Sequence, residues 1–130
     1  MNGVGQRNQV EITTSTGHSL CTDIPKKMGG SDAAPQPVET LVAAWMGCTQ
    51  ATALFVGRQM PERVVIEKLE FDNVQALRDE RGALQLSIDE TPKVPSRLQG
   101  ITGMIRVFSR NKKKGVTPEQ MELLKEQTEI

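Results

Sequence analysis

The sequence predicts an α+β fold, in which helices pack on antiparallel β-sheets. Short segments of alternating polar and apolar residues stand before and after one long apolar segment. That long segment has the three- and four-residue spacing of a helix, and a second helix start signal stands near the end of the chain. We therefore expect two strands, a long central helix, three strands and a short helix, within one domain spanning residues 1–130.

Residues 8–22 predict a strand, a turn and a second strand. Val10 and Ile12 alternate with polar neighbours, Gly17 marks the turn, and the alternation resumes through Leu20. A hairpin in this position would open an antiparallel sheet ahead of the long helix.

A proline-rich loop and the long helix follow. The segment 25–37 contains two adjacent glycines and three prolines, which neither a helix nor a strand tolerates. Residues 38–59 then predict a helix, with one face formed by Val38, Leu41, Trp45, Cys48, Thr52 and Phe55. Because further apolar residues widen this face, we expect the helix to be buried on most sides. Gly47 costs roughly 1 kcal/mol in mid-helix, which predicts close approach of another element near the thiol.

Three further strands are predicted after the helix. Residues 63–77 are rich in β-branched residues, with a phase break near Glu67 that indicates a bulge. Residues 78–82 resemble a hairpin turn, and residues 83–89 alternate strictly. After a proline-rich loop, residues 100–109 form the last predicted strand. These strands would build the sheet on which the long helix packs.

The last predicted element is a helix with a clear start signal. Residues 111–115 are a charged, solvated turn. Thr117 is then a helix N-cap, Pro118 takes the first helical position, and Gln120 can close a capping box. Met121, Leu124 and Thr128 follow on one face.

Composition limits the classes of partner. Lys plus Arg and Asp plus Glu both number 16, so the net charge of zero argues against a nucleic acid or a membrane surface. We find no run of about 18 apolar residues and no signal-type N-terminus, which favours a cytoplasmic protein, or one inside an organelle, without a membrane span. Hydrophobic residues make up 37%, with one Trp and three Phe, which is lean for a monomer and favours an oligomer.

Two cysteines, Cys21 and Cys48, lie 27 residues apart, which matches neither a redox CxxC pair nor a zinc site. In a reducing compartment both are expected as free thiols, and a disulfide between them stays open as an alternative. From helical spacing alone, Cys48 is a packing residue. A reactive thiolate there would need a cation from another segment, because the helix dipole acts only over the first turn.

Other candidate residues have ordinary explanations as well as functional ones. Arg7 could supply the cation or be a solvated terminal charge. Glu39 stands in the first helical turn, where the dipole favours a carboxylate, but it could also orient an arginine or a hydroperoxide proton. His18, the only histidine, lies in a turn and suits a surface role. We therefore expect no metal and no bound cofactor.

The stretch DIPKKMGGSDAAPQPVETLVAAWMGCTQAT resembles the OsmC/Ohr family of osmotically inducible and organic-hydroperoxide-resistance proteins. It has the family's Asp/Pro strand end, Gly-Gly pair, Pro-x-Glu helix start and helix cysteine. The resemblance covers nearly the whole chain, and this stretch is its specific part. It implies an OsmC-like fold, in which the long helices of an intertwined homodimer are buried against each other and the active sites lie at the interface. The implied activity is thiol-dependent reduction of organic hydroperoxides, followed by reduction of the enzyme by a lipoyl-type dithiol.

Transferred residue by residue, the resemblance makes Cys48 the peroxidatic cysteine. Arg7, in a Gly-x-Arg sequence, is similar to the arginine that stabilises the thiolate. Glu39 stands one residue later than the glutamate of the Ohr branch, and one residue turns a helical side chain by about 100°. The Pro-x-Glu form is therefore more similar to the broader OsmC-like branch.

One departure concerns the second cysteine, which the family carries near the end of the last helix. Either the sequence stops before it, or the protein lacks it and uses Cys21 or an external thiol. This leaves two alternatives to the peroxidase: a non-catalytic OsmC-like dimer that binds a small apolar ligand, and an interaction module whose thiols only pack.

Overall fold

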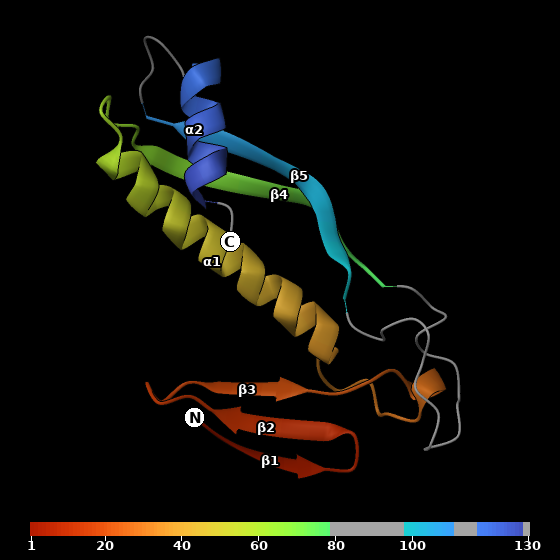
Figure 1. The fold of residues 1–130 in the computed structure, drawn as a ribbon. Coiled ribbons are helices and arrows are strands. Elements are labelled where there is room, and N and C mark those ends of the chain that lie inside the picture. The colour runs from red at the N-terminus through yellow and green to blue at the C-terminus, as the bar shows by residue number, and fades with distance from the viewer. Residues whose placement is uncertain (79–97, 111–116, 129–130) are drawn as a thin grey trace, which may run out of the picture. The chain divides into compact units, whose positions relative to one another are not determined.

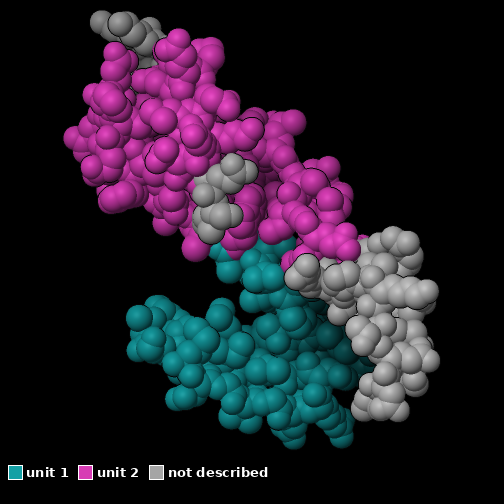
Figure 2. Space-filling view, viewed as in Figure 1, with its two compact units in different colours: residues 1–44 teal, residues 45–130 magenta. Residues whose placement is uncertain are grey.

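The computed structural model describes residues 1–78, 98–110 and 117–128. The chain forms two compact units, the N-terminal unit (residues 1–44) and the C-terminal unit (residues 45–130), which Figure 2 shows in different colours and which we describe separately. Along the chain (Figure 1) the elements are β1 (Asn2–Gln6), β2 (Gln9–Thr13), β3 (Ser19–Thr22), the 3-10 helix η1 (Lys26–Met28), α1 (Pro37–Gln59), β4 (Ile66–Leu77), β5 (Gly100–Ser109) and α2 (Pro118–Thr128).

The N-terminal unit contains a three-stranded antiparallel sheet in the order β1-β2-β3. The strands β2 and β3 confirm the predicted hairpin. The strand β1 was not predicted, because all five of its residues are exposed and show no alternation. Its last residue, Gln6, pairs with Gln9, so a turn of two residues, Arg7 and Asn8, connects β1 to β2.

The two glycines after β3 have separate structural reasons. Gly29 ends η1 in the left-handed region, with φ of 94°. A side chain at Gly30 would overlap the carbonyl oxygen of Ile24. The chain therefore needs glycine at both positions to turn back toward β3 before it enters α1.

The helix α1 begins one residue before the predicted position and ends where predicted. Its burial differs from the prediction. Val42, Thr49 and Ala53 are buried. On the predicted core face, Leu41 is 56% exposed and Phe55 is 63% exposed, and Trp45 and Thr52 are only half-buried. The helix is apolar on several sides, so periodicity alone could not show which side the chain itself covers.

The C-terminal unit pairs β4 with β5 antiparallel. The register shifts between Ile66 and Lys68, which confirms the predicted bulge near Glu67. A second shift lies between Asp72 and Gln75. The predicted strand 83–89, the turns 78–82 and 111–115 and the loop 90–97 lie wholly or largely outside the described residues.

The core of the C-terminal unit joins α1, β4 and α2. It consists of Ala53, Met60, Val64, Ile66 and Leu124. Because α1 and α2 both contribute to this cluster, the two helices pack on the same face of the β4–β5 pair.

The N-terminus of α2 has the predicted capping box. The Thr117 backbone N–H donates to Gln120 Oε1 at 3.0 Å, and the Gln120 N–H donates to Thr117 Oγ1 at 3.2 Å. These two bonds fix the start of α2 at Pro118, as the sequence indicated.

Candidate active site

Cys48 lies near the middle of α1, and its side chain is exposed as a free thiol. Leu41 and Phe55, each seven residues away, lie on the same side of the helix and are also exposed. The prediction that Cys48 belongs to a buried face is therefore wrong for the single chain. The thiol instead stands in an open apolar stripe formed by Leu41, Cys48 and Phe55.

The prediction that another element approaches the helix closely at Gly47 is also wrong for the described residues. A side chain added there would meet nothing within 4 Å beyond the helix's own backbone. The close approach occurs ten residues later, where a side chain at Gly57 would come within 2.6 Å of the Val64 carbonyl oxygen. Of these two glycines, Gly57, near the C-terminal end of α1, is therefore the one that lies against another segment of the described chain.

Arg7 lies in the turn between β1 and β2. The sequence had placed it ahead of the first strand, because β1 was not predicted. Its backbone has φ of 56°, in the left-handed region that few residues other than glycine adopt. Its side chain is exposed and makes no ion pair within the described part of the chain. The guanidinium is therefore available for a partner that the described residues do not supply.

The turn that carries Arg7 is attached to the loop before α1. Asn8 Nδ2 donates to the Gly29 carbonyl oxygen at 2.8 Å, and Gln9 Nε2 donates to Asp23 Oδ2 at 3.3 Å. Sequence reasoning missed these contacts, because an amide side chain in a turn or at the start of a strand gives no sign of its partner.

Asp23 is fully buried at the end of β3. Hydrogen bonds from the Ala33 N–H and then the Ile24 N–H hold the pKa of this carboxyl below its usual value, against the opposing effect of burial. Gln9 and the Ser31 N–H contribute in the same direction. An aspartate before Ile-Pro is the only sequence signal that could have pointed to this residue.

Glu39 caps the N-terminus of α1. Its Oε2 accepts a hydrogen bond from the Gln36 backbone N–H at 2.8 Å, which closes half of a capping box. No contact between Glu39 and Arg7 occurs among the residues that the structure describes. The helix-start explanation of Glu39 accounts for this hydrogen bond, and its role toward Arg7 stays a prediction.

The two remaining sequence candidates lie on the surface of the N-terminal unit. Cys21 is an exposed free thiol on β3, so no disulfide links it to Cys48. His18 is exposed in the turn before β3, where its backbone N–H donates to Thr14 Oγ1 at 2.9 Å. The approach of Arg7 to Cys48, which belong to different units, stays a prediction.

A cavity of about 740 Å³ opens in the C-terminal unit, between α1, β5 and α2. Trp45, Ile105 and Leu124 contribute to its largely apolar lining. Thr128 also lines it, and its buried hydroxyl has no hydrogen-bond partner within the described residues. Cys48 is not part of this lining.

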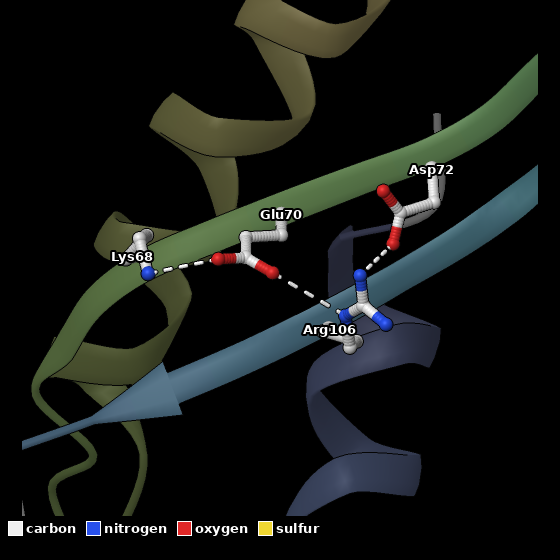
Figure 3. Close-up of polar contacts among 4 residues, drawn as sticks. All are labelled: Lys68, Glu70, Asp72 and Arg106. Atoms are coloured by element: carbon white, nitrogen blue, oxygen red, sulfur yellow. Dashed lines mark hydrogen bonds and ion pairs between the residues drawn. The ribbon is translucent and has the colours of Figure 1, made fainter.

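A row of charged side chains runs along β4 and β5 (Figure 3). Glu70 pairs with Lys68 Nζ at 2.8 Å and with Arg106 Nε at 3.3 Å, and Arg106 also pairs with Asp72. Lys68 additionally lies 4.4 Å from the centre of the Phe108 ring. The hydrogen bond from Lys68 in particular lowers the pKa of Glu70. Because these charges neutralise one another, the row is a solvated face without a free binding charge.

Neither the cavity nor the row of charges suggests a metal. In the ranges 1–78, 98–110 and 117–128 no group of three or more His, Cys, Asp or Glu side chains could hold an ion.

The helix α1 is long and apolar enough to cross a membrane, but core helices of soluble proteins meet the same criteria. The helix that carries Cys48 thus gives only weak support to a membrane span.

The fold places this chain among α+β proteins with one long helix and antiparallel sheets of the OsmC-like type, as the sequence predicted. A solved structure with this fold is a putative osmotic stress induced and detoxification response protein from Psychrobacter arcticus 273-4. The match has a TM-score of 0.68 and 14% sequence identity, and it covers 98% of this chain and 79% of the other. No protein-family model matches the chain, and no curated protein matches it. At this identity the likeness concerns the fold alone.

Proposed function

We propose that this protein is an OsmC-like thiol peroxidase that reduces organic hydroperoxides, with Cys48 as the nucleophile. The supporting observation is the exposed Cys48 thiol in the middle of the apolar stripe between Leu41 and Phe55. An organic hydroperoxide has an apolar body and a reactive O–O group, so an apolar surface around a thiol suits it. A protein described as a detoxification response protein has the same fold, and reduction of organic hydroperoxides is one kind of detoxification.

In the proposed reaction the Cys48 thiolate attacks one peroxide oxygen. An S–O bond forms while the O–O bond breaks, and the departing alkoxide takes a proton and leaves as an alcohol. Cys48 is then a sulfenic acid. A lipoyl-type dithiol attacks the sulfur and releases water, and its second thiol breaks the mixed disulfide, which returns Cys48 to the thiol.

Arg7 and Glu39 have supporting roles in this proposal. The exposed Arg7 guanidinium, which has no described ion-pair partner, would stabilise the Cys48 thiolate. Glu39 uses one carboxylate oxygen for the Gln36 N–H, and its other oxygen would orient the guanidinium. We propose no cofactor, because the dithiol acts as a second substrate.

We also propose that the active protein is a cytoplasmic homodimer. A helix with Leu41 and Phe55 more than half exposed is a face that a second copy of the chain would cover. In such a dimer the thiol would be enclosed at the interface. The two unpaired thiols are consistent with a reducing compartment.

The test measures consumption of cumene hydroperoxide with dihydrolipoamide as the reductant. We expect Cys48→Ser to abolish turnover with the fold unchanged by circular dichroism. Cys21→Ser is the matched control, because it removes the other exposed thiol. Turnover that survives in Cys48→Ser would end the proposal. Loss of turnover in Cys21→Ser alone, with one round of oxidation intact, would make Cys21 the resolving thiol.

A second candidate function is a non-catalytic OsmC-like dimer that binds a small apolar ligand. The cavity between α1, β5 and α2 favours it, because the cavity is largely apolar and contains an unpaired Thr128 hydroxyl. Treatment with one equivalent of hydroperoxide in the presence of dimedone separates the two functions. The peroxidase predicts a dimedone adduct on Cys48, and the binding protein predicts none.

A further inference from the structure

The Asp23 carboxylate connects three segments of the N-terminal unit. Its Oδ1 accepts a hydrogen bond from the Ile24 N–H at 2.8 Å. Its Oδ2 accepts three, from the Ala33 N–H at 3.0 Å, the Ser31 N–H at 3.3 Å and Gln9 Nε2 at 3.3 Å. The donors belong to the end of β3, to the loop before α1 and to the start of β2.

The hydrogen bond from Gln9 to the Asp23 carboxylate matters for Arg7. Gln9 and Asn8 directly follow Arg7, and both are bonded to the segment between β3 and α1, Gln9 through Asp23 and Asn8 through the Gly29 carbonyl. The Asp23 backbone N–H also donates to the Pro35 carbonyl at 3.0 Å, two residues before α1. The Asp23 carboxylate thus bonds the start of β2 through Gln9, and the Asp23 backbone N–H bonds the entry to α1 through the Pro35 carbonyl.

We propose that Asp23 is a positioning residue that fixes the Arg7 turn to the loop leading into α1. The Arg7 side chain has no described ion-pair or hydrogen-bond partner, so the place of its guanidinium depends on its turn. This inference rests on the proposed function, in which Arg7 stabilises the Cys48 thiolate. Asp23 itself touches neither the thiol nor the substrate in that function.

A carboxylate suits this position better than any other small side chain. All four of its contacts are donors, and a carboxylate is an acceptor at both oxygens. In the variant Asp23→Asn the amide nitrogen would have to face a donor, either the Ile24 N–H or the group of three. Because Asp23 is fully buried, water could not replace the lost bond.

The test measures alkylation of Cys48 by iodoacetamide at pH 7 in a Cys21→Ser background, where Cys48 is the only thiol. We expect Arg7→Ala to slow alkylation about tenfold, and Asp23→Asn to slow it several-fold, because a mobile guanidinium stabilises the thiolate less. In the Arg7→Ala background, Asp23→Asn should add nothing. Asp32→Asn, an exposed carboxylate of the same loop, is the matched control and should have no effect.

A second measurement addresses the turn directly and does not depend on the thiol chemistry. A nitroxide is attached to Arg7→Cys in a chain with Cys21→Ser and Cys48→Ser, and its mobility is recorded by electron paramagnetic resonance. We expect Asp23→Asn to increase the mobility and Asp32→Asn to leave it unchanged. Gln9→Ala, which removes only the link between the turn and the carboxylate, should increase it as well and covers the case in which Asp23→Asn does not fold.

The outcomes separate the two ideas. An equal slowing of alkylation by Asp23→Asn with and without Arg7 would overturn the positioning role, and so would unchanged nitroxide mobility in both Asp23→Asn and Gln9→Ala. If Arg7→Ala leaves alkylation unchanged while Asp23→Asn increases the nitroxide mobility as expected, Asp23 still positions the turn. In that case it is the proposed role of Arg7 at the thiolate that fails.

Discussion

Arg7 occupies a backbone conformation that glycine would adopt more easily. It has φ of 56° in a two-residue turn between paired strands, a place where glycine and asparagine are preferred. We expect Arg7→Gly to raise the free energy of unfolding by about 1 kcal/mol, because the strain of the left-handed conformation disappears. Urea unfolding followed by circular dichroism measures the change.

The control for this substitution is Arg7→Ala. It removes the guanidinium and keeps a Cβ in the strained conformation, so no gain in stability is expected. Equal stability of the glycine and alanine variants would show that the turn is unstrained. A gain for Arg7→Gly together with slower Cys48 alkylation would mean that the arginine is kept for its chemistry at a cost in stability.

Because the Asp23 carboxylate is buried and hydrogen-bonded, we expect the free energy of unfolding to depend on pH in the acidic range. Because hydrogen bonds, first of all from the Ala33 N–H, lower the pKa of Asp23 below 3.8 in the folded chain, the ionised form contributes stability above about pH 4. That contribution is lost as the pH falls through the lower pKa that Asp23 has in the folded chain. Urea unfolding of the native chain and Asp23→Asn should differ clearly at pH 7, and the difference should shrink below pH 4. A difference that stays constant would contradict this account, with Asp32→Asn as the control for removing a loop carboxylate.

At the scale of the element, we expect alanine at two glycines of α1 to change the stability of the protein in opposite directions. Alanine at Gly57 would bring a Cβ within 2.6 Å of the Val64 carbonyl oxygen, and we expect a loss of about 1–3 kcal/mol. Alanine at Gly47 meets nothing in the described chain and gains helix propensity, worth about 1 kcal/mol. Thermal unfolding of both variants tests the pair. A loss at Gly47 that grows with protein concentration would reveal a partner helix at that point.

The elements were predictable where local signals mark their ends. The capping box of Thr117 and Gln120 fixes the start of α2. Pro37 was assigned to the loop because proline breaks regular structure, whereas it is the first residue of α1, so the predicted start was one residue late. The strand β1 gave no such signal, because its residues are exposed and include Gly3 and Gly5. The covered side of α1 could not be read either, because Val42 and Leu41 are equally apolar and only packing separates them.

The candidate site was predictable only in part. Cys48, Arg7 and Glu39 were selected by their likeness to a family pattern, and spacing alone would have assigned the thiol to packing. Asp23 was missed because its four donors come from Gln9, Ile24, Ser31 and Ala33. Three of these donors are backbone groups, whose positions depend on the loop and leave no mark in the residue types.

For the whole molecule, the open apolar stripe of α1 predicts self-association. We expect the native chain to sediment as a dimer and Phe55→Glu to sediment as a monomer, because a charge in a buried helix interface lacks a partner. Met28→Glu is the matched control, since Met28 is 58% exposed on η1, outside the stripe. Analytical ultracentrifugation over a range of concentrations measures the dissociation constant. A native chain that stays monomeric throughout that range would refute the homodimer.

The only tryptophan of the chain stands one helical turn before Cys48. Trp45 meets Phe71 edge to face, with ring centres 6.3 Å apart, and it also lines the cavity of the C-terminal unit. The chain has no tyrosine, so emission excited at the red edge of the aromatic absorption comes from this single indole. The molecule therefore has an intrinsic fluorophore beside both of its candidate sites. Sulfur oxidation and cavity occupation can each be followed in real time by its emission, without a label.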